Sequence, residues 1–171
     1  KFPILSNEIN FESCLRLFEY KKKDQRIIMP TTNSAYGTGN KDNYCDENTP
    51  LNPISEYAEQ KVELEKILMK KNNVTSLRLA TVFGPSPRMR LDLLVNDFTF
   101  RAFKDGFIVL YESGFKRNYI HVYDIANVFL FCIKNMDKTN NEIFNVGLSD
   151  TNISKLELCE RIKKIIPNLN I

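Results

Sequence analysis

Histidine is almost absent from this 171-residue chain, in which His121 is the only one. Histidine-based zinc sites need two or three such ligands, so the sequence excludes a multi-histidine metal centre. The chain also lacks a Gly-x-Ser-x-Gly motif, the strained turn that exposes the nucleophile of many serine hydrolases. Two large classes of enzyme are therefore excluded, no metal ligand is predicted, and His121 is predicted to be a packed or hydrogen-bonded residue of a strand.

Cysteine is present without the spacing that would give it a role. No Cys-x-x-Cys pair typical of a zinc or redox site occurs, and all but one of the cysteines fall within apolar helical patterns. We interpret all of them as buried or chemically idle thiols: Cys14, Cys45, Cys132 and Cys159.

Long hydrophobic runs are missing as well. No stretch is long enough to span a bilayer and no signal peptide is recognisable at Lys1, so a cytoplasmic protein without a membrane partner is the default prediction. The formal net charge is only +3, and short lysine clusters fall near predicted helix ends: Lys21–Lys23, Lys70–Lys71 and Lys163–Lys164. Such clusters are usually solvated helix termini, so no nucleic-acid partner is predicted.

A glycine-rich phosphate-binding turn is also missing from the sequence. A dinucleotide needs a turn made of backbone alone to bring its pyrophosphate to a helix amino terminus, so this chain is not expected to hold one in the usual way by itself. The chain begins without a methionine, on what looks like the approach to a mid-domain helix, and stops directly after a helix. We therefore expect it to be the middle of a longer enzyme.

A hydroxyl, a phenol and an ammonium are present in the order that hydride-transfer chemistry needs. If the residues after Pro53 are helical, Tyr57 and Lys61 lie one turn apart on one face, with β-carbons about 5–6 Å apart. A nearby positive charge lowers the pKa of a phenol from its ordinary value of about 10, so the pair can transfer protons. A packed tyrosine beside a solvated lysine is the alternative for this pair, and a threonine that satisfies a turn is the alternative for Thr32.

The segments around these residues predict a βαβ crossover. An apolar strand, residues 26–30, leads into Thr31 and Thr32 and would place their hydroxyls at its carboxyl end, where open α/β sheets bind ligands. A polar loop follows from Gly37 to Asn52, Asn52 is predicted to cap a helix over residues 53–71, and residues 74–82 form the second strand.

The remaining pattern alternates strands and helices, which predicts an α/β fold. Helices are expected over residues 7–20, 87–104, 124–132 and from Ser154 onward, and strands over residues 107–111, 118–122 and 143–146.

Four motifs in order resemble the extended short-chain dehydrogenase/reductases, the NAD-dependent nucleotide-sugar epimerases and dehydratases. They are Pro30–Gly37, Tyr57-x-x-x-Lys61, Leu77–Pro85 and Arg117–Asp124. Within this family, the run Ser86–Phe98 most resembles the GDP-D-glycero-D-manno-heptose 4-dehydrogenase group of surface-polysaccharide pathways. The resemblance covers about Asn10 to Asp150.

The resemblance implies a partial Rossmann-like fold, a doubly wound parallel sheet with part of the smaller substrate-binding region. Residues 1–85 would be the C-terminal part of the NAD-binding domain and carry the catalytic helix. Residues 86–171 would be a mixed segment with the nucleotide-sugar-binding region and a returning Rossmann strand and helix. The family also implies a homodimer formed through a four-helix interface.

Catalytic and cofactor roles follow from the resemblance position by position. Thr32 matches the residue that hydrogen-bonds the sugar hydroxyl, Tyr57 the base that removes its proton, and Lys61 the residue that holds the nicotinamide ribose. Hydride would then pass from the sugar carbon to NAD. Asn10, Thr31 and Ala80 match positions that line the cofactor.

Substrate contacts are implied in the second half of the chain. Thr81, the backbone around Leu94, and Arg117 match the nucleotide-sugar side, with Arg117 facing a diphosphate oxygen of a GDP- or UDP-sugar. Arg88 and Arg90 are either substrate-binding residues or surface charges, and the sequence leaves both possibilities open.

One departure from the family narrows the chemistry. The 4,6-dehydratases carry an Asp-Glu pair after the threonine, whereas this chain carries Asn33 and Ser34. Elimination of water is therefore disfavoured, and oxidation at C4 or oxidation followed by re-reduction, which is epimerisation, remain. The alternative function is a truncated, non-catalytic module that binds a sugar nucleotide or a partner.

Overall fold

The computed structural model describes residues 3–38 and 44–171, and its described residues form two compact units. Unit 1 runs up to Leu79 and takes in Val128–Val146, whereas unit 2 consists of Ala80–Asn127 and Gly147–Ile171. Each unit therefore contains two separate stretches of the chain. The middle of the predicted loop, residues 39–43, lies outside the described residues.

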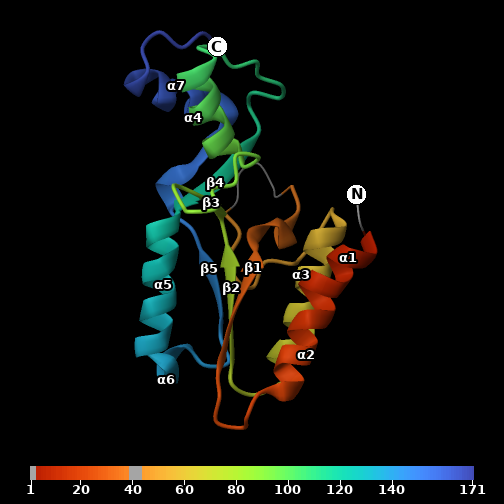
Figure 1. The fold of residues 1–171 in the computed structure, drawn as a ribbon. Helices are drawn as coiled ribbons and strands as arrows, with labels where there is room; N and C mark the ends of the chain where they lie inside the picture. The colour runs from red at the N-terminus through yellow and green to blue at the C-terminus, as the bar shows by residue number, and fades with distance from the viewer. Residues whose placement is uncertain (1–2, 39–43) are drawn as a thin grey trace. The chain divides into compact units, whose positions relative to one another are not determined.

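A parallel sheet is the centre of unit 1. Its strands are β1 (Ile27–Thr32), β2 (Val74–Leu79) and β5 (Ile143–Val146), in the spatial order β1-β2-β5. Figure 1 shows α5 (Val122–Lys134) on one side of this sheet and α2 (Ser13–Tyr20) and α3 (Glu56–Met69) on the other. Helices on both faces are what a parallel sheet needs to bury its strands.

The predicted βαβ crossover is confirmed, because α3 connects the parallel neighbours β1 and β2. The predicted start of the helix is wrong. Ser55 is the capping residue, with an extended backbone and a hydroxyl that accepts the Ala58 N–H at 3.3 Å. Asn52 lies three residues too early, in a segment that is not yet helical.

The amino-terminal helix begins earlier than residue 7. It consists of α1 (Pro3–Asn7), a π-helical turn η1 (Glu8–Glu12) and α2. Buried Met29, Leu64, Leu68 and Val74 form a core between β1, β2 and α3, and apolar side chains of η1 and α2 pack against it. This packing fixes α3 against the sheet, as the 3.6-residue apolar period predicted.

Unit 2 has a smaller mixed sheet. Its strands are β3 (Thr81–Phe83), β4 (Lys116–His121) and β6 (Asn152–Ser154), with β3 parallel and β6 antiparallel to the central β4. The helices α4 (Leu94–Lys104) and α7 (Lys155–Ile165) pack together over its apolar core. Ser154 caps α7 in a capping box with Glu157, which confirms the predicted cap.

Two of the predicted strands are wrong: the one that crosses from unit 1 into unit 2, and one within unit 2. Residues 74–82 were expected to form one strand, but the chain leaves β2 at Leu79 and enters a different sheet with β3 at Thr81. Residues 107–111 form no strand, since only Phe107 makes an isolated bridge, to Asn170. The Val109 and Tyr111 side chains are 62% and 77% exposed, whereas Ile108 is buried and Leu110 packs against the core of unit 2, so only one side of this run is covered.

Other boundaries shift by a few residues. α4 begins at Leu94, well after the predicted start at Pro87, and α5 begins at Val122, directly where β4 ends. The predicted strand over residues 143–146 is confirmed as β5. Three short helical segments complete the described chain: the 3-10 turns η2 (Asn33–Tyr36) and η3 (Ser149–Thr151) and the helix α6 (Met136–Thr139).

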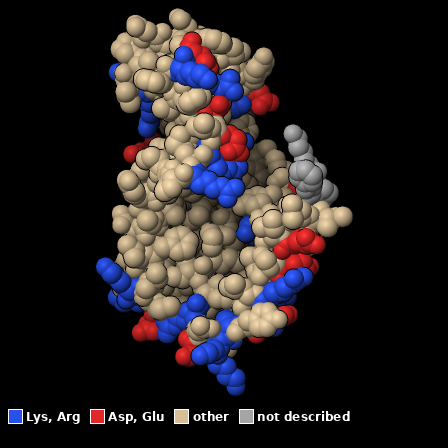
Figure 2. Space-filling view, viewed as in Figure 1, with Lys and Arg blue, Asp and Glu red and all other residues tan. Residues whose placement is uncertain are grey.

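Surface charge is mixed in the view of Figure 2, where Lys and Arg side chains lie among Asp and Glu side chains.

Within residues 3–38 and 44–171, no helix combines the length and the apolar character that a membrane span requires. The thiols of Cys132 and Cys159 are buried, as predicted, whereas those of Cys14 and Cys45 are half-buried, and all four cysteines are free.

Candidate active site

Thr32 is the last residue of β1 and caps the 3-10 turn that follows it. Its backbone is extended and its hydroxyl accepts the Ser34 N–H at 3.1 Å. The residue is 9% exposed and stands at the carboxyl end of a strand in a parallel sheet. This is the edge where open α/β sheets bind ligands.

Tyr57 and Lys61 lie side by side in the first turns of α3. The Lys61 Nζ is 5.9 Å from the centre of the Tyr57 ring, within the range of a cation–π contact. The Tyr57 side chain is 45% exposed and Lys61 is half-buried. The predicted shared face of the helix is therefore present, with an ammonium beside an accessible phenol.

The topology brings this pair to the same edge of the sheet as Thr32. α3 starts after the carboxyl end of β1 and runs back along the sheet, so its first turns lie at that end. α3 also packs against both β1 and η2, the turn that Thr32 caps. The three residues predicted to be catalytic thus all lie in unit 1, around the carboxyl end of β1.

Two of the residues predicted to line the cofactor also lie in unit 1. The Asn10 amide donates to the Ser6 hydroxyl at 3.2 Å, and Ser6 donates to the Gln60 side chain at 3.4 Å, which places Asn10 beside α3 next to Lys61. The Thr31 hydroxyl is buried and bonds to Glu65 at 3.2 Å. Thr31 therefore offers a ligand its backbone rather than its side chain.

Thr32, which is also predicted to bind the sugar, lies in unit 1, whereas the other residues predicted to bind the nucleotide sugar lie in unit 2, together with Ala80. Thr81 opens β3 and pairs with Tyr119, Leu94 opens α4, and both are half-buried. Ala80 is buried, and a Cβ on Gly147 would lie 3.3 Å from its methyl group. Close packing here leaves little room for a larger side chain at either position.

Arginines supply positive charge in unit 2. Arg117 is exposed on β4, with its guanidinium carbon 5.6 Å from the centre of the Phe115 ring. Arg88 is exposed in the connection between β3 and α4. Arg90, in the same connection, forms a two-bond ion pair with Asp92 at 2.6 and 3.1 Å, so part of its bonding capacity is used locally.

His121 is a packed residue, as predicted. Its Nδ1 accepts the Tyr123 N–H at 3.3 Å, and its ring meets Phe83 edge-on with 5.3 Å between ring centres. Gly84 has a φ of +125°, and a Cβ there would lie 2.7 Å from the His121 Nε2. The ring therefore fills the space beside Gly84.

Sequence reasoning missed a buried polar network that lies on α3 next to the pair predicted to be catalytic. Glu65 and Arg78 are 3% and 4% exposed and form a two-bond ion pair, with a shortest contact of 2.6 Å. Burial lowers the pKa of the Arg78 guanidinium, but hydrogen bonds to Glu65 and Tyr36 outweigh burial and raise that pKa, so Arg78 stays cationic. A charged residue inside an apolar strand was the available signal.

The chain's own residues fit one end of NAD. Lys61 beside Tyr57 presents ammonium donors that suit ribose hydroxyl oxygens, at the ligand-binding edge of the sheet. The pyrophosphate would need a glycine-rich turn, and the sequence has none. Among the described residues, no group of three His, Cys, Asp or Glu side chains could hold a metal ion.

Sequence comparisons place these features among known proteins. A model of the NAD dependent epimerase/dehydratase family matches residues 2–147. The UDP-glucose 4-epimerase of Lactobacillus helveticus is 30% identical over 141 residues, which cover 70% of this chain and 42% of that protein. The ADP-L-glycero-D-manno-heptose-6-epimerase of Brachyspira hyodysenteriae is 28% identical over 160 residues, with 87% and 49% covered. The chain spans about half the length of the curated relatives it matches.

Solved structures confirm the predicted α/β, Rossmann-like fold. The dTDP-glucose 4,6-dehydratase of Bacillus anthracis, solved with NAD, has a TM-score of 0.83 at 22% identity, over 94% of this chain and 52% of that chain. The UDP-glucose 4-epimerase of Thermotoga maritima, solved with UDP-glucose, has a TM-score of 0.81 at 25% identity, over 99% and 58%.

Proposed function

This chain belongs to the NAD-dependent epimerase/dehydratase family, and from that premise we propose that it supplies the proton-transfer groups of a nucleotide-sugar epimerase or dehydrogenase. NAD is the cofactor of this family, as its name states. The observation that carries the proposal is the position of Lys61, whose ammonium lies 5.9 Å from the Tyr57 ring at the carboxyl edge of a parallel sheet. A general base of this kind needs a neighbouring cation to act near neutral pH.

Each group has a defined task in the proposed oxidation. The Thr32 hydroxyl already accepts the Ser34 N–H, so its own proton is available to the oxygen of the sugar hydroxyl. Tyr57, as phenolate, takes the proton of that hydroxyl, and Lys61 stabilises the phenolate and binds ribose hydroxyls. NAD, when bound, accepts the hydride that leaves the same carbon. The O–H and C–H bonds thus break together to leave a ketone.

The proposed outcome is oxidation at C4, with or without return of the hydride to the opposite face of the sugar. Elimination needs an acid–base pair after the threonine, and Asn33 and Ser34 cannot supply one, because neither side chain ionises near neutral pH. Both residues lie in η2, directly after Thr32. We therefore favour an epimerase or 4-dehydrogenase over a dehydratase.

The substrate proposed for this chain is a GDP- or UDP-sugar. Arg117 and Arg88 are exposed cations suited to a diphosphate, and Thr81 and the backbone near Leu94 supply further polar contacts in unit 2. The relatives named above act on UDP-glucose or an ADP-heptose, which supports a nucleotide-linked sugar. The run Ser86–Phe98 favours a heptose for surface polysaccharide, made in the cytoplasm.

The full reaction is proposed to need a segment outside these residues. The sequence has no glycine-rich turn for the pyrophosphate, and the chain spans about half the length of its curated relatives. Residues up to about 85 would then complete the NAD-binding domain together with the returning strand β5 and its helix, and the rest of residues 86–171 would contribute the sugar-nucleotide region. By itself the 171-residue chain is expected to be inactive.

Turnover of the longer protein that we propose to contain this chain tests the function. NAD is supplied with a panel of UDP- and GDP-sugars, and we expect NADH or an epimerised sugar to form. Tyr57→Phe should abolish turnover without unfolding, since the Tyr57 ring is 45% exposed. Absence of turnover on every sugar, or a fully active Tyr57→Phe variant, would count against the assignment.

A second candidate function follows from the missing glycine-rich turn. The 171-residue chain would then bind a sugar nucleotide without redox chemistry. Calorimetry of the 171-residue chain tests this function. A rise in melting temperature with a GDP-sugar supports a binding module, and a further rise with NAD would count against it, because a ligand stabilises only the fold that binds it.

A further inference from the structure

The proposed catalytic pair shares its helix face with a buried carboxylate. Tyr57, Lys61 and Glu65 follow one another every four residues along α3, within an arc of about 80° around its axis. Exposure falls along this stripe, from 45% at Tyr57 to 3% at Glu65. Glu65, the buried residue of the three, is therefore the one whose side chain the rest of unit 1 can bind.

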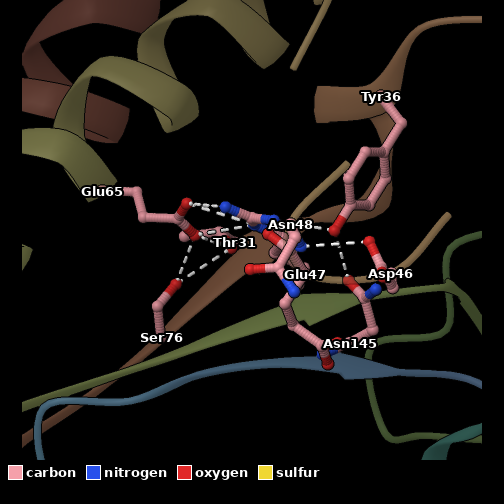
Figure 3. Close-up of polar contacts among 9 residues, drawn as sticks. Thr31, Tyr36, Asp46, Glu47, Asn48, Glu65, Ser76 and Asn145 are labelled. Carbon is pink, nitrogen blue, oxygen red and sulfur yellow. Dashed lines mark hydrogen bonds and ion pairs between the residues drawn. The ribbon is translucent and has the colours of Figure 1, made fainter. Parts of the chain in front are cut away.

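Three side chains hold Glu65, and Figure 3 shows its carboxylate beside Ser76 and Thr31. Arg78 of β2 donates to both of its carboxylate oxygens, at 2.6 to 3.2 Å. The Ser76 hydroxyl donates to Glu65 Oε2 at 2.6 Å, and the Thr31 hydroxyl donates to the same oxygen at 3.2 Å. Both strands that face α3 thus bind the same carboxylate.

The part of the Arg78 guanidinium that does not contact Glu65 also forms hydrogen bonds. Its Nη1 donates to the Tyr36 hydroxyl at 2.7 Å and to the Glu47 carbonyl at 3.2 Å. Tyr36 in turn donates to the Asn145 side chain of β5 at 2.7 Å. The guanidinium therefore links α3 to β2 and to η2, the turn capped by Thr32, and through Tyr36 to β5, while Glu65 makes the contact with β1.

Stability alone is a weak reason for such a network. Taking two charges out of water costs much of what their attraction returns, and apolar side chains of similar volume often serve the fold as well. A two-bond contact between a carboxylate and a guanidinium does fix direction, however, because both groups are planar. Orientation is therefore what this pair contributes.

We propose that Glu65 and Arg78 are positioning residues that fix the rotation of α3 against the end of β1, and so set Tyr57 and Lys61 relative to Thr32. The proposal rests on the function proposed above. α3 turns as a rigid rod, so any rotation at Glu65 is carried to Tyr57. The connection to Thr32 is direct, because Thr31 is its neighbour in β1 and bonds Glu65.

The test follows the phenol of Tyr57 rather than turnover. The chain is labelled with ¹³C in its tyrosine rings, the Tyr57 signal is assigned with Tyr57→Phe, and its titration is recorded without NAD or sugar. Glu65→Gln and Arg78→Lys should each shift the midpoint by about half a pH unit or more, because the distance from Lys61 changes. Arg78→Lys keeps the charge but loses the two-bond geometry.

Arg26→Gln is the matched control. It breaks an ion pair of unit 1, to Asp137 at 2.9 Å, that does not involve α3, and it should leave the Tyr57 titration unchanged. A lower unfolding free energy with an unchanged titration in Glu65→Gln and Arg78→Lys would make the pair merely structural and overturn the proposal.

A double variant covers the case in which single variants do not fold. Glu65→Leu with Arg78→Met removes both charges together, which buried pairs tolerate. A folded double variant with a shifted Tyr57 titration supports the proposal, and one with the wild-type titration refutes it. Because no cofactor or substrate is present, failure here is distinct from failure of the turnover assay.

Discussion

Some side chains of this protein stabilise the fold by packing, and others are exposed where a ligand can reach them. Tyr57 is large and aromatic, yet 45% of it is exposed, and its neighbour Lys61 is only half-buried. Tyr57 and Lys61 are therefore partly accessible to a ligand, and the burial of neither side chain is complete enough to assign it to the core. Thr32 differs, because its hydroxyl also closes a turn.

Thr32→Val separates these two roles of the threonine. Loss of the hydroxyl leaves the Ser34 N–H without its acceptor, so the unfolding free energy should fall by about 1 kcal/mol. Turnover of the longer protein should fall by about 10²-fold, the usual cost of one donor to a reacting oxygen. Denaturant unfolding and steady-state rates measure the two effects.

Thr32→Ser is the matched control for that substitution. Serine keeps a hydroxyl in the same place, so both stability and turnover should stay near the wild-type values. A Thr32→Val variant that loses stability but keeps its turnover would reduce Thr32 to a residue of the turn.

Cys159 gives the chain a predictable response to alkaline pH. Burial raises the pKa of its thiol from 9.0 to about 11. Because the folded state keeps a proton that the unfolded thiol releases, this contribution to stability is complete below pH 9.0 and is lost as pH rises toward 11. The slope in that window is about 1.4 kcal/mol per pH unit.

Urea unfolding inside and below this window measures the effect of Cys159. Cys159→Ala should be less stable at every pH because of the cavity that it leaves, but its stability should depend less steeply on pH. Equal slopes for both proteins would show that the thiol does not titrate as its burial predicts.

The ion pair between Glu65 and Arg78 could be predicted only in part from the sequence. Arg78 lies between Leu77 and Leu79 in a strand, so its need for a partner was visible in the sequence. The identity of that partner was not, because Glu65 reaches it only after α3 docks on β2. Tyr57 and Lys61 were predictable because four residues along one helix need no tertiary contact.

At the scale of secondary-structure elements, the local sequence predicted that a helix or strand exists better than it predicted the residues at which the element begins and ends. α3 was expected to begin after Asn52, but Ser55 holds the extended conformation and the hydroxyl contact that a cap needs. Both residue types cap helices well, and only the path of the chain decides between them. The capping box at Ser154 was predictable because its partner Glu157 lies three residues on.

Ser55→Ala tests the observed start of α3. Removing the acceptor of the Ala58 N–H should lower the unfolding free energy by about 1 kcal/mol. Asn52→Ala is the comparison, because it removes the side chain that the sequence pattern favoured, and a smaller loss is expected. Thermal unfolding of both variants decides, and a larger loss from Asn52→Ala would contradict the observed cap.

Strand patterns do not reveal their partners. The apolar run 74–82 reads as one strand, yet it serves two sheets, with the break at Ala80. The run 107–111 has strong β character and lies mostly exposed. A strand exists only where another strand accepts its hydrogen bonds, and that acceptance is a property of the whole fold.

At the scale of the molecule, exposed apolar side chains on the first helical segment lead us to propose the homodimer that the family resemblance implies. Ile4, Ile9, Leu17 and Tyr20 are 59% to 86% exposed, and their segment packs beside α3. The expected assembly pairs these helices between two copies. Apolar surface of this kind is what such interfaces bury.

Leu17→Glu tests that interface by light scattering. A charge placed in a buried contact between copies should convert a dimer into monomers without unfolding either. Leu130→Glu is the control, because Leu130 is also about half exposed, at 51%, but lies on α5. A monomeric wild-type chain, or equal effects of both substitutions, would argue against this interface.

The interleaved order of the two units has a consequence for synthesis on the ribosome. β2 is translated early, but β5, its neighbour on one side, emerges only after residues 80–127. Until then the amide of Ser76, which later donates to the Glu142 carbonyl at 3.0 Å, has no partner on that edge. The nascent chain thus displays an open parallel strand while unit 2 is being made, and during this interval it is most in need of chaperones.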